Sequence, residues 1–339
     1  MNVSIWVSDD CNCKCDYCYE DKCKRHNMMS EKTALEVVNF IRSKYSPKND
    51  QTLQIRIIGG EPLLNFGVAQ KLMEGIKEIF PENVIFDITT NGTLISNENC
   101  NYISEIFSSV SISIDGLPQY HNKHRKFNNG TGTYDKVLEG FKKLDETKTC
   151  IIGRMTITEE NVSYLYQNVS HLVDLGFTVI EPVPDFTSKR WNNETGEILR
   201  QQFIKLVSLQ KELNGSVEIR GIRSASHTPK NGKCDGGITS FQISSNGDIY
   251  PCAVTVNDIR FKLGNVHIPT QIRKSVLDEI SKLSAEPVKE CLGCKRYDYC
   301  RATKCRLINM AYSGNSSQPL PITCLVENIS VQTCRLYDL

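Results

Sequence analysis

The stretch Asp9-Asp10-Cys11-Asn12-Cys13-Lys14-Cys15-Asp16-Tyr17-Cys18-Tyr19 decides how the rest of the chain is interpreted. Taken through Cys11, Cys15 and Cys18, it has the spacing C-x-x-x-C-x-x-C, with an aromatic residue just before the last cysteine. Three thiolates on one short loop can ligate three irons of a [4Fe–4S] cluster, which leaves the fourth iron open to a small molecule. The alternative is a structural zinc loop, because C-x-x-C pairs are also common in zinc sites.

The segments on both sides of this loop predict a strand before it and a helix after it. Val3-Ser4-Ile5-Trp6-Val7 alternates apolar and polar residues, as a short strand does. Ser30 can cap a helix whose apolar residues between Ala34 and Ile41 recur at i, i+3, i+4 and i+7. The cysteines therefore follow the carboxyl end of a first strand, where α/β barrels place their reacting groups.

A second motif, Gly59-Gly60-Glu61-Pro62, follows the strand-like stretch Leu53–Ile58. Glycines at the end of a strand let the backbone approach a ligand closely, and proline restricts the turn. A glutamate at this place can accept hydrogen bonds from a bound ammonium group. Alone, the tetrapeptide is an ordinary turn signal, so its weight comes from its position downstream of Cys18.

Strand-like and helix-like segments then alternate as far as residue 182. Further strands are predicted at 84–89, 110–116, 150–157 and 178–182, and helices at 66–80, 134–144 and 162–175. Such alternation predicts a parallel sheet with right-handed crossovers. We therefore expect an α/β fold with an open, partial (β/α)6 barrel over residues 1–185. A helix at Glu194–Leu213 and a turn-rich stretch up to Pro229 predict a linker over 186–230.

The C-terminal region, residues 231–339, is rich in cysteine and carries a hairpin signal. Asn246-Gly247 separates two alternating runs within Phe241–Cys252, which favours a tight β-turn. The cysteines of this region are Cys234, Cys252, Cys291, Cys294, Cys300, Cys305, Cys324 and Cys334. Cysteines at such spacings indicate metal binding, either by iron–sulfur clusters or by a zinc ribbon.

Composition and charge argue against several classes of protein. A net charge of +1 gives no field to attract nucleic acid or an anionic membrane, so we expect neither as a partner. No apolar run approaches the roughly 20 residues that span a bilayer, and no signal peptide precedes the first strand. We expect a cytoplasmic protein, in which the 15 cysteines serve as metal ligands or catalytic groups rather than disulfides.

Together, the cysteine loop and the glycine motif resemble those of the radical S-adenosylmethionine (SAM) superfamily. The resemblance implies that Cys11, Cys15 and Cys18 are the catalytic cluster ligands. It implies a SAM pocket that contains Tyr17, Gly59, Gly60, Glu61, Asn91, Ser113, Asp115 and Arg154. In this pocket Glu61 would hold the amino group of SAM, and Arg154 would pair with its carboxylate. The alternative for Asn91-Gly92 is a turn, and for Ser113 an ordinary strand residue.

The C-terminal cysteines resemble the SPASM extension of radical SAM enzymes, which carries two auxiliary [4Fe–4S] clusters. By matched position, the first auxiliary cluster would be held by Cys234, Cys252 and Cys305. The second would be held by Cys291, Cys294, Cys300 and Cys324. Four residues separate Cys300 from Cys305, where the family usually has three. No cysteine lies between Cys234 and Cys252, so the first cluster would keep an open iron unless Cys334 supplies the fourth ligand.

The resemblance implies three [4Fe–4S] clusters and SAM, whose reductive cleavage gives a 5′-deoxyadenosyl radical. The stretch Ile114-Asp115-Gly116, with His121, Arg125 and Gly130 after it, is similar to members that modify peptides and proteins. We expect a precursor peptide as substrate, a Cys sulfur-to-carbon thioether as product, and a flavodoxin- or ferredoxin-type electron donor. Alternative reactions are formylglycine formation in a sulfatase, and carbon–carbon cross-linking or epimerisation of a peptide. The non-enzyme alternative is a zinc-ribbon binding protein, which would not need Glu61 and its glycines.

Overall fold

The computed structural model describes residues 1–18, 20, 26–47, 52–147, 149–222, 234–268 and 272–338. Its strands are β1 (Asn2–Ser8), β2 (Leu53–Gly59), β3 (Val84–Thr90), β4 (Ser109–Ser113), β5 (Cys150–Ile157), β6 (Val179–Pro184), β7 (Glu218–Ile219), β8 (Ser240–Ile243), β9 (Asp248–Tyr250) and β10 (Gly264–Asn265). Its α-helices are α1 (Glu31–Lys44), α2 (Phe66–Ile79), α3 (Cys100–Ile106), α4 (Pro118–His124), α5 (Tyr134–Asp145), α6 (Leu165–Asp174), α7 (Asn193–Glu212), α8 (Lys274–Ala285), α9 (Arg301–Lys304), α10 (Arg306–Ser313) and α11 (Pro321–Asp338). Cys23 and the part of the predicted linker beyond residue 222 lie outside the described residues.

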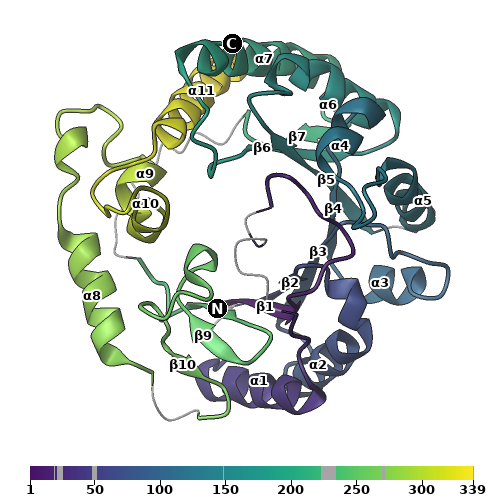
Figure 1. The fold of residues 1–339 in the computed structure, drawn as a ribbon, viewed down its shortest axis with the longest axis vertical. Helices are drawn as coiled ribbons and strands as arrows, with labels where there is room; N and C mark the ends of the chain where they lie inside the picture. Colours follow the sequence, from purple (N-terminus) through teal and green to yellow (C-terminus); the bar gives the residue numbers. More distant parts are fainter. Residues whose placement is uncertain are drawn as a thin grey trace.

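The described strands form one sheet in the order β10-β9-β8-β1-β2-β3-β4-β5-β6-β7. From β1 to β7 each strand runs parallel to the next one along the chain. These strands form an arc with helices on its outside (Figure 1). The predicted partial barrel is confirmed, and β7 extends its arc beyond the six expected strands.

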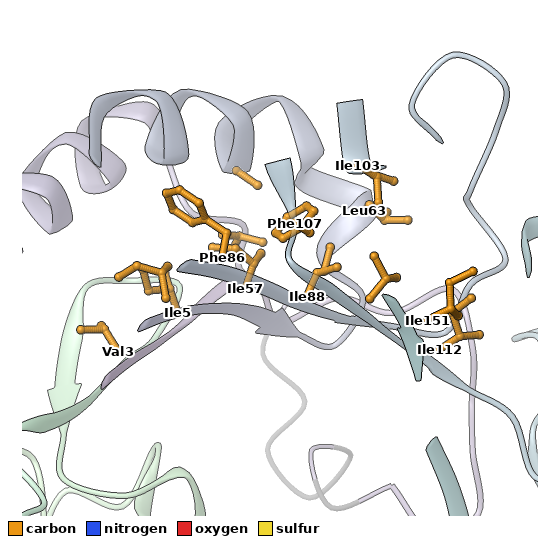
Figure 2. Close-up of a cluster of buried hydrophobic side chains, with 14 of the residues drawn as sticks. Val3, Ile5, Ile57, Leu63, Phe86, Ile88, Ile103, Phe107, Ile112 and Ile151 are labelled. Carbon is orange, nitrogen blue, oxygen red and sulfur yellow. The ribbon is translucent and has the colours of Figure 1, made fainter. Parts of the chain in front are cut away.

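The core lies between the outer face of this arc and the helices. Figure 2 shows Val3, Ile57 and Phe86 among the side chains that point from the strands toward this layer. Along β2, Ile55 and Ile57 are fully buried, whereas Arg56 between them is exposed. Successive side chains of a strand point to opposite faces, so polar residues such as Arg56 face the inside of the arc. Each buried aliphatic or aromatic side chain contributes about 1.5–3 kcal/mol to folding.

The helix after the cysteine loop begins where its sequence predicts. The side-chain oxygen of Ser30 accepts a hydrogen bond from the backbone N–H of Thr33 at 3.0 Å and so caps α1. The apolar positions of α1 are buried against α2 and the sheet. None of the described helices is both long and apolar enough to cross a membrane.

The C-terminal region joins the same sheet through a hairpin. Strands β8 and β9 are antiparallel, and Gly247 in their turn has a φ of +85°, which favours glycine. Strand β8 also pairs in parallel with β1, so the hairpin extends the sheet beyond its first strand. Helix α11 packs against α7, and α8 to α11 complete the ring seen in Figure 1. One sheet therefore runs through all three predicted regions, whose boundaries stay a prediction.

Candidate active site

The cysteine loop leaves the carboxyl end of β1 and is held there by the segment that follows α4. The backbone N–H of Lys14 donates to the carbonyl of Lys126 at 2.7 Å. Cys13 and Phe127 form an isolated antiparallel bridge. Residues 124–128 thus give the loop a strand-like partner more than 100 residues away, although neither segment has the periodicity of a strand.

The three cysteines of the motif are half-buried. Burial raises the pKa of Cys15 to about 11, and Cys18 and Cys11 add to the effect while Arg125 opposes it. Within the described ranges, no group of three or more His, Cys, Asp or Glu side chains is arranged to hold a metal ion. Three neighbouring thiols on one loop are nevertheless a donor set that suits a [4Fe–4S] cluster, whose irons each take one cysteine.

Gly59 and Gly60 allow the end of β2 to pack backbone against backbone on the segment that enters the cysteine loop. A Cβ atom on Gly60 would lie 2.5 Å from the carbonyl oxygen of Asp10. A Cβ atom on Gly59 would overlap the carbonyl oxygen of Ser8. The N–H of Gly60 donates to Ser8 and that of Glu61 to Asp10, both at 2.8 Å. In this structure the glycines therefore position the loop.

The carboxylate of Glu61 is fully buried and joins the ends of two strands. It accepts hydrogen bonds from the N–H of Leu63 at 3.0 Å, the hydroxyl of Thr90 at 2.7 Å and the N–H of Asn91 at 2.7 Å. Burial raises the pKa of Glu61 to about 7, although these hydrogen bonds oppose the shift. Glu61 is thus an internal anchor, and its predicted contact with SAM stays a prediction.

We expect the free energy of unfolding to fall as Glu61 ionises. The folded protein binds this proton more tightly than the unfolded chain, since the pKa rises from 4.5 to about 7. The stabilising contribution is complete below pH 4.5 and is lost as the pH rises through 7, with a total of about 3 kcal/mol. Urea unfolding at pH 5 and pH 8 should show this extra loss in wild type but not in Glu61→Gln. Equal pH dependence in the two proteins would contradict the shift.

Asp115 is fully buried and accepts four hydrogen bonds. Arg125 donates through Nε at 2.9 Å and Nη2 at 3.1 Å, the N–H of Thr156 donates at 2.9 Å, and the Tyr17 hydroxyl completes the set. Burial opposes ionisation, but Arg125 outweighs it, and the pKa of Asp115 lies below its usual 3.8. A carboxylate offers about four acceptor positions, so this one has none to spare for SAM.

The other predicted SAM residues lie at or near the same ends of the strands. Asn91 follows β3, and its Nδ2 donates to the thiol of Cys13 at 3.3 Å. Ser113 ends β4 and stands beside Arg154 of β5 in the sheet register. The guanidinium of Arg154 is paired with Glu181 of β6 at 2.9 Å, so a SAM carboxylate would share it with that residue.

A pocket of about 230 Å³ opens beside the cysteine loop. Its walls are Asp16–Cys18 of the loop and the segments that follow β5 and β6, which contribute Thr158, Asp185 and Arg190. Thr158, Asp185 and Arg190 were not among the residues predicted from the sequence. Their signal was positional, since parallel strands of one sheet end at one edge.

The C-terminal cysteines gather in two groups. The first C-terminal group consists of Cys234, Cys252 and Cys305. Burial and the nearby thiols of Cys234 and Cys305 raise the pKa of Cys252 to about 11. The second group consists of Cys291, Cys294, Cys300 and Cys324, since burial and the other three thiols raise the pKa of Cys291. Cys334 is buried on α11 and donates to the carboxylate of Asp338 at 3.7 Å. These are the predicted ligand sets, and metal binding by them stays a prediction.

Tyr312 of α10 lies near both the first C-terminal group and the barrel. Burial raises the pKa of its phenol, and the neighbouring charges of Cys252 and Asp185 raise it further. Asp185 also lines the pocket beside the cysteine loop. The first C-terminal group therefore lies on the side of the barrel that carries the pocket.

The family follows from comparison with known proteins. Residues 6–171 match the model of the radical SAM superfamily. The chain is a radical SAM enzyme. A relative is the cysteine-type anaerobic sulfatase-maturating enzyme of Clostridium perfringens (strain 13 / Type A), which is 28% identical over 330 residues, 88% of each chain. The non-enzyme alternative, a zinc-ribbon binding protein, is therefore wrong.

Two solved structures share the fold of this radical SAM enzyme. The first is native anSMEcpe with bound AdoMet and Cp18Cys peptide, with a TM-score of 0.81 and 22% identity over 99% of this chain and 96% of that one. The second is Streptococcus suis SuiB bound to its precursor peptide SuiA, with a TM-score of 0.70 and 16% identity over 95% and 75%. The radical SAM enzyme thus has SPASM-type architecture, and by sequence it is related to the sulfatase-maturating enzyme.

Proposed function

We propose that this enzyme modifies a ribosomally synthesised peptide by joining a cysteine sulfur to a carbon atom. The observation that carries the proposal is the group of three thiols, Cys234, Cys252 and Cys305, on the pocket side of the barrel. A [4Fe–4S] cluster with three protein thiolates has room for a fourth, and a substrate cysteine can supply it. The peptides bound to anSMEcpe and to SuiB support a peptide substrate.

The proposed cofactors are SAM and three [4Fe–4S] clusters. Cys11, Cys15 and Cys18 would hold the first cluster, and the two C-terminal groups would hold the others. When bound, the first cluster and SAM supply a carbon-centred radical that removes a hydrogen atom from the substrate. We propose a flavodoxin or ferredoxin as the electron donor and the cytoplasm as the location.

The chain's own residues bind and orient the reactants. The packing of Gly59 and Gly60 on Ser8–Asp10 positions the cysteine loop relative to the ends of β1 and β2. The pocket beside Cys18 can admit a side chain. In the proposed reaction the peptide would lose one hydrogen atom from carbon to the SAM-derived radical and one proton from the thiol to solvent, and the surplus electron would pass to a C-terminal cluster. The peptide becomes lighter by two hydrogen atoms and keeps its sulfur.

The number of protein ligands in the first C-terminal group provides a test. We expect Cys305→Ala to lose about four irons per chain after anaerobic reconstitution, because two thiolates cannot retain the cluster. Cys334→Ala, which removes a thiol that donates to Asp338 on its own helix, should retain them. Iron and sulfide assays on both variants measure the difference. Retention of these irons in Cys305→Ala would mean that three other thiolates, Cys334 among them, still hold the cluster, and it would remove the open position.

SAM affinity tests the role of Glu61. In Glu61→Gln, the amide nitrogen must face a backbone N–H that can only donate, either that of Asn91 or that of Leu63. Loss of the proposed hydrogen bond from the amino group of SAM to the charged carboxylate of Glu61 costs about 1.5–3 kcal/mol. We expect SAM to bind roughly ten- to a hundredfold more weakly by calorimetry. Glu139, whose exposed carboxylate pairs with Lys136, supplies the control, Glu139→Gln. Unchanged SAM affinity in Glu61→Gln would contradict the proposed role of Glu61.

Formylglycine formation is the second candidate, because the sulfatase-maturating relative covers 88% of this chain. The two reactions leave different products. A thioether keeps the sulfur and removes a free thiol, whereas formylglycine formation from cysteine expels the sulfur. Mass spectrometry of a cysteine-containing peptide after turnover separates them. Carbon–carbon cross-linking or epimerisation would leave the thiol free.

A further inference from the structure

A buried ion pair lies directly behind the cysteine loop. The two carboxylate oxygens of Asp115 accept from Nε and Nη2 of Arg125 at 2.9 and 3.1 Å, which is the bidentate geometry of a strong pair. Asp115 is fully buried and Arg125 nearly so. Both residues lie outside the loop, since Asp115 follows β4 and Arg125 ends α4.

Tyr17 connects this pair to the cysteines. Its hydroxyl donates to Asp115, and the guanidinium of Arg125 lies 5.2 Å from the centre of its ring. Tyr17 stands between Cys15 and Cys18 in the sequence. Movement of the loop would therefore break a charge-assisted hydrogen bond and a cation–π contact at once.

The charges behind the loop are balanced. Arg125 supplies one positive charge close to Cys15, and Asp115 supplies one negative charge. His121 is neutral here, since burial lowers its pKa to about 3. Its Nε2 lies 2.8 Å from the hydroxyl of Thr133. Removal of either member of the pair would leave a net charge close to Cys15 in a poorly solvated place.

We propose that the Asp115–Arg125 pair, acting through Tyr17, holds the cysteine loop in its cluster-binding conformation and sets the charge beside Cys15. The three are positioning residues. The inference rests on the proposed role of the loop in cluster binding. It predicts two separate effects, one on the order of the loop in the protein without metal and one on the reduction potential of the bound cluster.

Loop order is tested by amide hydrogen exchange in the metal-free protein. Tyr17→Phe removes the hydroxyl and keeps the ring, so the fold should persist. We expect exchange at residues 11–18 to become about tenfold faster or more, as loss of a bond to a charged group implies. The control is Tyr134→Phe, which removes a phenol whose hydrogen-bond partner, at 2.6 Å, is His171 and not Asp115. Unchanged exchange of the loop in Tyr17→Phe would overturn the positioning role.

The charge effect is tested by redox titration of the cluster whose electron paramagnetic resonance signal changes when SAM is added. Reduction adds a negative charge, which Arg125 stabilises and Asp115 opposes. We expect Arg125→Met to lower the reduction potential and Asp115→Asn to raise it. A tenfold change in the ratio of oxidised to reduced cluster is about 59 mV for one electron. Shifts in the same direction would indicate disturbed packing alone and would overturn the charge role.

Arg125→Lys separates charge from geometry, because it keeps the charge but loses the bidentate fork. Its potential should stay near that of wild type, while its loop should exchange faster. If wild-type protein binds no cluster at this loop, the proposed function fails. The exchange experiment on Tyr17→Phe still decides whether the pair orders the loop.

Discussion

Replacing Cys11, Cys15 and Cys18 together by alanine is expected to abolish reductive cleavage of SAM. The three thiols are the donor set of the loop at the end of β1, and without them the loop offers no thiolates in this spacing to a cluster. Production of 5′-deoxyadenosine with dithionite, measured by chromatography, should fall below detection. The C-terminal groups should keep their iron, so the total should fall by about four irons per chain.

Cys13→Ala is the matched control, because Cys13 lies in the same loop but outside the C-x-x-x-C-x-x-C spacing. This variant loses a thiol that accepts from Asn91 at 3.3 Å and should keep most of the cleavage activity. If the triple variant still made 5′-deoxyadenosine, the cluster would have to lie elsewhere. If Cys13→Ala alone abolished it, the assignment of ligands within the loop would be wrong.

Gly59→Ala is expected to have a large effect on both stability and activity. The added Cβ would overlap the carbonyl oxygen of Ser8, which is backbone and cannot rotate away. Relief requires β1 and β2 to separate where they support the cysteine loop. We expect a loss of about 3 kcal/mol or more in chemical unfolding, in the range of severe overpacking, together with loss of SAM cleavage.

The control for this substitution is Gly67→Ala in α2, where an added Cβ meets no atom within 4 Å. Alanine favours a helix over glycine, so this variant should be as stable as wild type or slightly more so. A Gly59→Ala protein with wild-type stability and activity would show that the two strand ends do not need their close approach.

The sequence predicted the barrel and the places of its motifs because those features are local. Alternation of apolar residues marks β1 and β2, and Ser30 marks the start of α1. Asn246-Gly247 marks the turn between β8 and β9 in the same way. The cysteine spacing predicted which thiols share a loop, since a loop keeps its own residues together.

Contacts between distant segments were not predictable from such patterns. Nothing in the sequence periodicity indicates that Lys14 pairs with Lys126, or that Asp115 receives four donors. Glu61 and the two glycines before it have the expected position, but their visible contacts are with the protein itself. Long-range tertiary packing, which depends on the whole fold, decides these partners.

The most direct test of the central proposal is turnover with a peptide deuterated at all of its carbon-bound positions. The reconstituted enzyme would be incubated with SAM, dithionite and a set of synthetic cysteine-containing peptides. The proposal predicts deuterium in 5′-deoxyadenosine, and a peptide that has lost one deuterium and one hydrogen, keeps its sulfur and lacks one free thiol. Deuterium-free 5′-deoxyadenosine with every peptide unchanged, from enzyme that cleaves SAM, would contradict it.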